Sequence, residues 1–390
     1  MHLTRLALTN YRNYAAQELE LAPGNVLLLG ENAQGKTNIL EAAFLLATGR
    51  ADRATTDADL IAWEAREEAQ PFARVEGKAQ RRSGDVAVEV TIVGRPGAQG
   101  RLVASKRFKL NGVARRGTDV AGTILAVLFT TDDMELVKGS PGGRRRYLDI
   151  MLTQADRAYA RALSKYGKVV TQRNALLKRI QEGDAKADEL EYWDGELAAD
   201  AAYIAVERAR AVEQIAREAR DAHGRLSGER EAFEVAYDAR LVDGWPAERL
   251  AASEAADAAE AFLAKLRAVR SRDIAAGVTL SGPHRDDLIM TIGGEAAASF
   301  ASRGQQRTAA LALRLAEARL LEGRSGERPL LLLDDVLSEL DESRRASVLA
   351  AFDADQALIT SADPDRFPAS FVAESQVWRV AAGVASLIAT

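Results

Sequence analysis

The segment GENAQGKT, residues 30–37, constrains the fold more than any other part of this chain. It matches the pattern G-x-x-x-x-G-K-[ST] and lies between an apolar stretch, NVLLLG at 25–30, and a predicted helix at 37–48. Glycines let such a loop wrap its backbone N–H groups around phosphate oxygens. Lys36 is then placed to reach the β- and γ-phosphates, and Thr37 is placed to bind Mg²⁺. The residues assigned to nucleotide binding here are Gly30, Glu31, Asn32, Ala33, Gln34, Gly35, Lys36, Thr37 and Asn38.

A second apolar stretch ends in two carboxylates. PLLLLDDVLSELD, residues 329–341, predicts a buried strand with Asp334 and Asp335 at its carboxyl end. Asp334 is placed to hold Mg²⁺, and Asp335 is placed to polarise an attacking water as a general base; the alternative is an acidic cap of the next helix. Thr360 and Ser361 end the following predicted strand, and either is a candidate sensor of a γ-phosphate. Together with the glycine-rich loop, these residues predict an ATPase that uses ATP and Mg²⁺.

A third segment, SRGQQRTAALALRLAEA at 302–318, begins with polar residues and continues as an amphipathic helix. Ser302 is a suitable N-cap, whereas Gly304 costs about 1 kcal/mol relative to alanine inside a helix. The N–H groups at a helix start are able to hold an anion. The glycine therefore needs an explanation other than helix stability.

The alternation of sheet and helix patterns predicts two parts. Residues 1–141 and 273–390 contain short strand-like segments, including an antiparallel block with an Asn111-Gly112 hairpin turn. Residues 142–272 contain two long Ala- and Glu-rich helices, and Arg173 interrupts the apolar seam of the first. We predict an α/β head, with a mixed sheet and an antiparallel β subdomain, split by a helical insertion. The insertion either projects as a short arm or packs as a second lobe.

Composition limits the possible sites and partners. The net charge is −5 over 390 residues, so contact with nucleic acid requires a local basic patch, and no single stripe stands out in the sequence. The absence of cysteine excludes disulfides and Cys-ligated zinc or iron–sulfur sites. No apolar run approaches the ~18–20 residues that span a bilayer, and no secretory segment follows Met1. We expect a cytoplasmic protein without membrane contact.

The Ser-x-Gly-Gln segment at 302–305 lies just upstream of the second acidic strand and resembles the signature motif of ABC-type ATPases. In that class the signature contacts the γ-phosphate bound to the other subunit, so that two heads enclose two ATP molecules. The resemblance assigns Ser302, Gly304 and Gln305 to this role, and a side chain at Gly304 would block the close approach. LSELD, residues 337–341, matches the segment that crosses the same dimer interface.

Four further segments resemble the RecF family, whose heads are similar to those of SMC and Rad50-type proteins. They are NYRNY near the N-terminus, GENAQGKTNILEA around the glycine-rich loop, DDMELVKGSPGGRRRYLD at 132–149 and LSGPHRDDL at 280–288. They follow the order of the family and cover both ends of the chain. The fold that this resemblance implies is an ABC-type head at 1–141 and 273–390, with lobe II at 142–272.

The resemblance also implies properties of the nucleotide site. Asp335 is one methylene shorter than the glutamate of ABC transporters, as in RecF-like proteins, which implies slow hydrolysis suited to a switch. Thr131 stands where the family usually has proline, a departure that affects the rigidity of this loop. Arg12 and Asn13 are expected at the adenine or ribose end of ATP, the alternative being that they solvate the end of a strand.

Basic residues in the two other family segments have two possible roles. Arg144, Arg145 and Arg146 either bind phosphates of DNA or brace the junction between head and arm. His284 and Arg285 lie in a Gly-Pro turn, which we expect to connect the returning helix to the sheet rather than to bind a metal.

By resemblance, the chain is an ATP-dependent DNA-binding protein that forms a homodimer on ATP. It would bind double-stranded DNA at junctions with single-stranded gaps and help RecR and RecO to load RecA, in association with the nucleoid. Gap repair, replication restart and the SOS response are the processes implied. One alternative, an SMC- or Rad50-like structural ATPase, needs longer coiled coils than residues 142–272 provide. The other, an ATP-gated protein scaffold, needs no contact with DNA and suits the acidic net charge.

Overall fold

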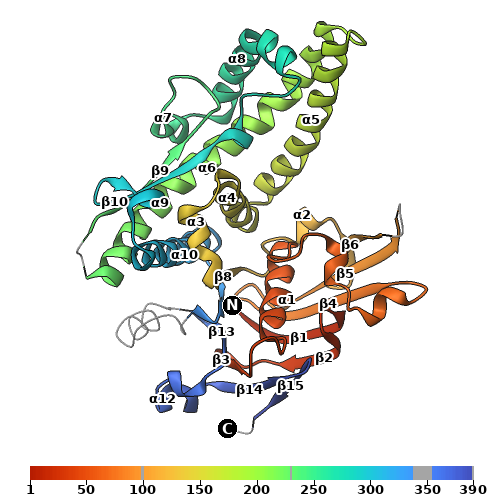
Figure 1. Ribbon diagram of the computed structural model, residues 1–390, viewed down its shortest axis with the longest axis vertical. Coiled ribbons are helices and arrows are strands. Elements are labelled where there is room, and N and C mark those ends of the chain that lie inside the picture. Colours follow the sequence, from red (N-terminus) through yellow and green to blue (C-terminus); the bar gives the residue numbers. More distant parts are fainter. Residues whose placement is uncertain (98–100, 229–230, 337–353, 389–390) are drawn as a thin grey trace. The chain divides into compact units, whose positions relative to one another are not determined.

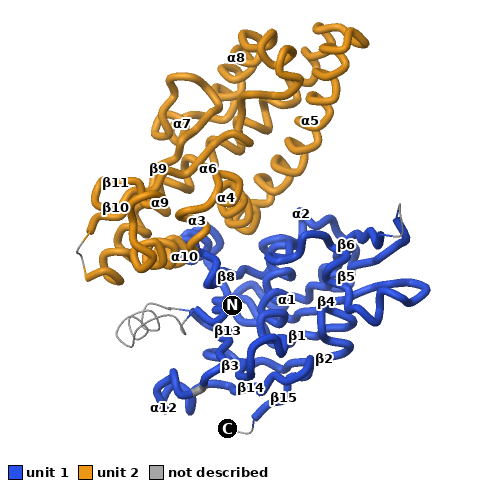
Figure 2. The backbone as a smooth tube through the Cα atoms, viewed as in Figure 1, with its two compact units in different colours: residues 1–133, 317–390 blue, residues 134–316 orange. Residues whose placement is uncertain are grey.

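The structure is a computed structural model that describes residues 1–97, 101–228, 231–336 and 354–388. Within these ranges the chain forms two compact units, residues 1–133 with 317–390 and residues 134–316 (Figure 2). The boundary near the C-terminus falls inside helix α10, Arg303–Ser325. The second unit is larger than the predicted insertion, because it also includes the family segment before it and most of the signature helix after it.

A mostly parallel sheet forms the centre of the first unit, with strand order β15-β14-β3-β13-β12-β8 (Figure 1). β15 pairs antiparallel with β14, and the other pairs are parallel. The apolar stretches around Leu27 and Leu332 form strands as predicted, and both side chains are fully buried. β8 and β15 complete the sheet without having been predicted. The strands are β3 (Gly24–Leu29), β8 (Ala126–Thr130), β12 (Leu330–Asp334), β13 (Gln356–Ser361), β14 (Gln376–Ala381) and β15 (Val384–Leu387).

A second sheet of the same unit is antiparallel, in the order β2-β1-β4-β5-β6-β7. Its strands alternate buried and exposed residues, which places one face against the core. Asn111 and Gly112 both have positive φ, so the predicted tight turn joins β6 to β7. The strands are β1 (His2–Tyr11), β2 (Tyr14–Glu20), β4 (Phe72–Gln80), β5 (Val86–Pro96), β6 (Leu102–Leu110) and β7 (Val113–Arg115).

Helix α1, Lys36–Thr48, contacts strands of both sheets and buries eleven of its thirteen residues. It begins one residue earlier than predicted and ends at Thr48 as predicted, followed by Gly49 in the left-handed conformation. The short helices of this unit are η1 (Asp57–Leu60), η2 (Glu64–Glu67), α2 (Gly117–Val120), η4 (Thr131–Asp133), η8 (Pro364–Arg366) and α12 (Ala369–Ala373).

Within residues 142–272 of the second unit, the described part of the chain forms three long helices where the sequence predicted two. α5 (Arg157–Glu182) and α6 (Leu190–Ser227) form the predicted pair, and α8 (Ala255–Ala276) packs against both. No helix in the described part of the chain is long and apolar enough to cross a membrane. The remaining helices are α3 (Met134–Lys138), α4 (Pro141–Ala155), η5 (Ala187–Glu189), α7 (Ala247–Ala252), η6 (Pro283–Arg285) and α9 (Ala297–Phe300).

A small sheet in this unit corrects one expectation. The range 273–390, which was predicted to contribute strands to the head, contains β10, Asp287–Ile292, but this strand does not belong to either sheet of the first unit. It pairs antiparallel with β9, Phe233–Asp238, and with β11, Glu295–Ala296. The apolar pattern alone identified the strand but not its partner, because a half-buried strand looks the same in any sheet.

Arg173, which interrupts the apolar seam of α5, is fully buried and holds three elements of the second unit together. Its Nε donates to Asp194 at 2.8 Å, and its Nη1 donates to Asp273 at 2.7 Å and to Thr279 at 2.8 Å. Both carboxylates are also fully buried. A buried arginine between two carboxylates is tolerated only because its charge and most of its donors are satisfied.

Replacing Arg173 with methionine is therefore expected to lower the free energy of unfolding by about 3–5 kcal/mol, since buried Asp273 loses the arginine that pairs with it and buried Asp194 keeps only Arg270. Denaturant unfolding measures this difference. The matched control is Arg267→Met, because Arg267 pairs with Glu191 at the surface and its loss should leave the midpoint nearly unchanged. Equal effects of the two substitutions would contradict the structural role of Arg173.

Candidate active site

A cleft in the first unit lies where the carboxyl ends of β3, β12 and β13 meet the start of α1. The parallel register places Asp334 beside Thr360, so these strands end together at one edge of the sheet. Of the residues predicted to bind nucleotide, Gly30, Glu31, Gln34 and Asn13 do not line the cleft. The lining residues are Arg12, Asn32, Ala33, Gly35, Lys36, Thr37, Asn38, Glu41, Arg53, Thr131, Asp334, Asp335 and Thr360.

The backbone of the glycine-rich loop is shaped for its turn into α1. Ala33 and Gly35 both have positive φ, 64° and 116°. A Cβ atom at Gly35 would come within 2.5 Å of Asn13 Nδ2 and 2.7 Å of the Tyr14 hydroxyl, so both conformation and space require glycine. α1 has no side-chain cap and no acidic residue in its first turn. Its N-terminal N–H groups therefore suit an anion such as a phosphate.

Asn13 supports this loop from outside the cleft rather than entering it. Its Nδ2 donates to the Gln34 carbonyl at 3.0 Å, and its Oδ1 accepts from Asn38 Nδ2 at 2.7 Å. The Tyr14 hydroxyl donates to the Gly35 carbonyl at 3.1 Å. These bonds tie the turn after β1 to the loop, a role that the sequence did not predict for Asn13.

Lys36 folds its side chain back over the loop. Its Nζ donates to the carbonyls of Gly30 at 2.6 Å and Glu31 at 2.7 Å, and the side chain is buried. Burial lowers the pKa of Lys36 below its usual value, and the carboxylates of Asp335 and Asp334 oppose that shift. The ammonium group thus lies in the loop that encloses the cleft, with acidic groups near it.

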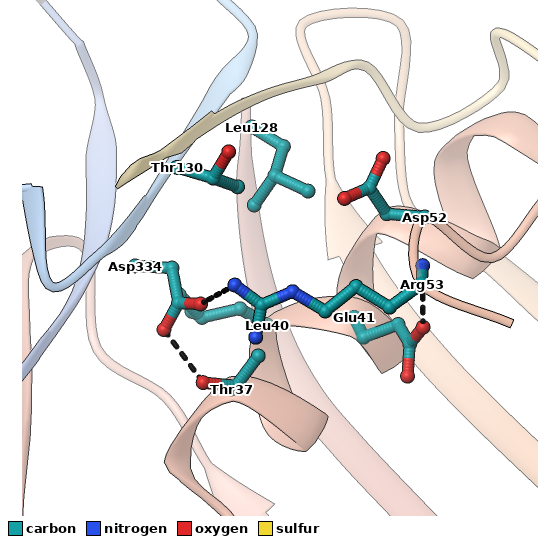
Figure 3. Close-up of a pocket in the computed structure, with 8 residues that line it drawn as sticks. All are labelled: Thr37, Leu40, Glu41, Asp52, Arg53, Leu128, Thr130 and Asp334. Atoms are coloured by element: carbon teal, nitrogen blue, oxygen red, sulfur yellow. Dashed lines mark hydrogen bonds and ion pairs between the residues drawn. The ribbon is translucent and has the colours of Figure 1, made fainter. Parts of the chain in front are cut away.

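Asp334 connects the two sides of the cleft (Figure 3). Its Oδ1 accepts from the Thr37 hydroxyl at 2.7 Å and from the Thr360 hydroxyl at 3.0 Å. Its Oδ2 lies 3.0 Å from the Arg53 guanidinium. Asp335 follows with a positive φ of 54°, and its N–H donates to the Thr360 hydroxyl at 2.9 Å. The predicted Thr37, Asp334 and Asp335 are thus brought together.

Of the two candidate phosphate sensors, Thr360 lines the cleft. Ser361 is buried, and its hydroxyl donates to the Asp363 carbonyl at 3.0 Å. Thr360 therefore remains the better candidate for this role.

Two charged residues that the sequence did not single out, Glu41 and Arg53, complete the cleft. Glu41 is 3% exposed, and both of its oxygens accept from Arg12, each at 2.8 Å. Glu41 Oε1 also accepts from the Arg53 backbone N–H at 3.2 Å. The sequence does contain one sign of this contact, because Glu41 is a lone acidic residue inside the apolar helix segment NILEAAFLL and needs a buried partner. Arg12, expected to contact nucleotide, is positioned by Glu41 at the side of the cleft.

The signature residues belong to the second unit. Ser302 precedes α10, and Gly304 and Gln305 lie in its first turn. The Gln305 N–H donates to Ser302 Oγ at 3.3 Å, and the Ser302 N–H donates to Gln305 Oε1 at 2.6 Å. This reciprocal pair confirms Ser302 as the predicted cap. The segment LSELD at 337–341 lies outside the described residues.

The two remaining family segments meet inside the second unit. Arg144 is buried and donates through Nε and Nη2 to both oxygens of Asp287, at 2.7 and 2.8 Å. Arg145 Nη1 donates to the Asp286 carbonyl at 2.7 Å. Buried Arg208 contacts Asp149 at 2.7 Å and Asp286 at 3.3 Å. Arg144 and Arg145 are thus engaged inside the second unit, and the bracing of a junction between head and arm stays a prediction.

His284 also has internal partners. Its Nδ1 lies 2.5 Å from the Tyr166 hydroxyl, and its Nε2 lies 3.0 Å from the Thr279 carbonyl. Burial lowers the pKa of His284, which favours the neutral imidazole. Arg285 Nη2 donates to the Thr279 carbonyl at 3.3 Å. The turn at 283–285 consequently joins α5 and the end of α8 within its own unit, rather than leading into the large sheets.

Comparisons with known proteins agree with these motifs. The RecF/RecN/SMC N-terminal domain family matches residues 2–378. A protein named DNA replication and repair protein RecF from Chloroflexus aurantiacus is 42% identical over 98% of this chain and 99% of its own length. The chain belongs to the RecF family. A RecF of the same name from Geobacillus thermodenitrificans is 36% identical, with 98% of each chain covered.

Solved structures extend the comparison to the fold. The recombination mediator protein RecF, described with ATP in the RecFOR pathway, superposes with a TM-score of 0.86 at 30% identity, covering 100% of this chain and 98% of that chain. The Smc head domain of Pyrococcus furiosus, with an extended coiled coil, has a TM-score of 0.51 at 16% identity, covering 99% and 96% of the two chains. The predicted RecF-type ABC ATPase head fold is thereby confirmed.

The contact between Arg12 and Glu41 generates a prediction about stability. Arg12→Ala leaves a buried carboxylate without its bidentate partner and is expected to lower the free energy of unfolding by about 2–3 kcal/mol. Arg12→Lys keeps the charge but not the paired geometry, so its effect should be intermediate. Arg5→Ala, on the strand β1 that precedes Arg12, is the control, because the partner of Arg5, Glu18, is exposed. Thermal unfolding measures both variants. A larger decrease of the melting temperature in Arg5→Ala than in Arg12→Ala would refute the assignment.

Proposed function

We propose that this chain is an ATP-dependent DNA-binding ATPase that acts as a recombination mediator. ATP joins two copies into a homodimer that binds duplex DNA near single-strand gaps, and slow hydrolysis separates the copies. RecR and RecO are its partners in loading RecA for gap repair, replication restart and the SOS response. The observation that carries this proposal is the convergence of Lys36, Thr37, Asp334 and Asp335 on one cleft. The names of the similar proteins support the assignment to DNA repair and the RecFOR pathway.

The residues of the cleft fit ATP and a divalent cation. The uncapped N-terminus of α1 and the ammonium group of Lys36 suit the phosphates. The Thr37 hydroxyl and the Asp334 carboxylate are hard oxygen ligands 2.7 Å apart, and Asp334 already accepts one cationic group, that of Arg53. Thr37 and Asp334 would therefore hold Mg²⁺, which neutralises phosphate charge when bound.

The neighbouring groups supply orientation and proton transfer. Asp335 lies at the cleft with a left-handed backbone fixed by the bond of its N–H to Thr360. Its carboxylate is the group placed to orient a water and to accept the proton that the water releases on attack. Arg12, with Glu41 behind it, remains at the side of the cleft where the nucleoside end of ATP is expected.

A second copy is needed to complete the site. Ser302 and Gly304 begin a 23-residue helix whose N-terminal turn is directed at an anion in ABC-type ATPases. We assign them to the γ-phosphate bound by the partner copy. An aspartate at position 335, where ABC transporters have glutamate, implies slow hydrolysis. Slow hydrolysis and the requirement for two copies both favour a switch over a motor.

The contact with DNA finds support in the charge of α5. This helix contains seven Lys or Arg residues and one acidic residue, in a chain whose net charge is −5. Exposed Arg157, Arg161, Lys168 and Arg179 are separated by 4, 7 and 11 residues, which are close to whole numbers of helical turns. They form one stripe, about 33 Å long at 1.5 Å per residue, comparable with one turn of B-DNA. Such a stripe matches a row of phosphates.

A substitution at the proposed base tests the ATPase half of the proposal. Asp335→Asn is expected to slow hydrolysis by about a hundredfold or more while ATP still binds, so that ATP-bound dimers accumulate. Light scattering with ATP and phosphate-release assays measure the two effects. Asp365→Asn, an exposed acid outside the cleft, is the control. Hydrolysis by Asp335→Asn at the wild-type rate would remove Asp335 as the base.

Neutralising the basic residues of this stripe tests the proposed binding of DNA. The triple variant Arg157→Gln, Arg161→Gln and Lys168→Gln is expected to weaken binding to gapped duplex and to reduce the salt slope of log K by about 2.7, because about 0.9 counterions are released per phosphate contact. Its ATP-dependent dimer should persist. The same change at Arg217, Arg220 and Arg225, exposed residues of α6 interspersed with acids, is the matched control. If the wild-type protein binds no DNA with ATP, the scaffold alternative is favoured instead.

A further inference from the structure

The side chain of the signature glutamine, Gln305, is occupied within its own chain. Its Oε1 accepts from the Ser302 N–H at 2.6 Å, as described above. Its Nε2 donates to both oxygens of Glu231, each at 2.7 Å. The amide group thus has partners at both ends, whereas the sequence predicted that Gln305 reaches the nucleotide of a second copy.

Glu231 itself is held in place by buried neighbours. It comes two residues before Phe233, the first residue of β9, which is 1% exposed and pairs with Ile292 of β10. The Phe233 ring packs against that of His223 near the end of α6, with centroids 5.1 Å apart. The Ala232 carbonyl accepts from the Gly293 N–H at 2.8 Å. The residues that follow Glu231 are therefore anchored to β10 and to the ring of His223, and from this end of β9 its carboxylate contacts Gln305 of α10.

A carboxylate at this position selects one orientation of the Gln305 amide. Because an ionised carboxylate only accepts hydrogen bonds, the NH₂ end of the amide must face Glu231 and the oxygen must face away. In that orientation the oxygen meets the Ser302 N–H, and Ser302 Oγ accepts from the Gln305 N–H. The hydroxyl hydrogen of Ser302 has no acceptor among the described residues, so it is available to donate to a phosphate oxygen.

We propose that Glu231 is a positioning residue for the signature motif. Through the Gln305 amide it fixes the backbone and hydroxyl of Ser302 in the orientation that meets the γ-phosphate of a second copy. Gln305 accordingly supports Ser302 and does not itself contact nucleotide. This inference rests on the proposed ATP-dependent dimer, and it links the end of α6, the longest helix described, to the dimer contact.

The first comparison truncates the carboxylate. Glu231→Ala is expected to leave the affinity of the monomer for a fluorescent ATP analogue within twofold of wild type, because the binding cleft lies in the other unit. ATP-dependent dimerisation, measured by analytical ultracentrifugation, is expected to weaken about tenfold or more, the effect of two lost hydrogen bonds to a charged group. Glu295→Ala, an exposed acid on β11 of the same small sheet, is the matched control and should behave as wild type.

The second comparison exchanges the two partners. Gln305→Glu alone places a second carboxylate opposite that of Glu231. Because the two like charges repel, this variant should also lose dimerisation. The double variant Glu231→Gln with Gln305→Glu restores an amide facing a carboxylate, and glutamate at this position forms a normal capping box with Ser302. It is expected to dimerise about tenfold better than Gln305→Glu alone. A rescue of dimerisation by the exchange would show that the contact between residues 231 and 305 positions the signature motif, since general damage to the fold would not be repaired by a second substitution. This comparison remains valid even if Glu231→Ala does not fold.

Wild-type dimerisation by Glu231→Ala would overturn the inference, and so would an exchange variant no better than Gln305→Glu. Additive losses in the double alanine variant of Glu231 and Gln305 would also overturn it, because residues acting through one contact are not additive. Ser302→Arg serves as the separate test of the proposed function. If Ser302→Arg still forms ATP-dependent dimers, the proposed function itself fails, whatever the result at Glu231.

Discussion

The carboxylate of Asp334 is the contact on which the cleft depends, because it joins parts of the chain that are almost 300 residues apart in sequence. One oxygen accepts from the hydroxyls that begin α1 and end β13, and the other lies beside a guanidinium from the segment after α1. The parallel register of β12 and β13 fixes where these groups meet. The bond to Thr37 ties the first turn of α1, and with it the end of the glycine-rich loop, to the edge of the sheet. The geometry of the cleft is thus set by the sheet.

In the second unit, the polar contacts between family segments stabilise the fold and do not line the cleft. The family segments around Arg144 and Asp286 supply partners for each other, so their charges are used inside the fold. The exposed charge of α5 and the Ser302 hydroxyl are the groups that the proposed function assigns to ligands. An acidic chain can in this way carry a local row of exposed basic residues, as α5 does.

Local patterns in the sequence were sufficient for the strands around the phosphate loop, for α1 and for the cap at Ser302. These features depend on residues within a few positions of one another. The sequence did not reveal the contact of Arg53 with Asp334, the pairing of β9 with β10 or the contact of Glu231 with Gln305. Each joins distant residues, and a chain with 52 basic and 57 acidic residues offers many equivalent partners for any charge. The third helix, α8, was missed because its weak amphipathic pattern resembles that of a solvated helix.

The buried cluster around Arg173 has a consequence for how this protein can change over evolutionary time. Its members come from α5, α6, α8 and the segment before the turn at 283–285, and none of the three charged groups is exposed. Replacing Arg173 alone removes the cation between two buried carboxylates, and replacing either carboxylate alone leaves a buried donor of Arg173 without its acceptor, whereas an apolar set of similar volume would be acceptable as a whole. These positions should therefore vary jointly among relatives, and intermediates that carry only part of the change should be rare. In the helical unit, surface residues would then be substituted one at a time, whereas the residues of this buried cluster would be substituted together.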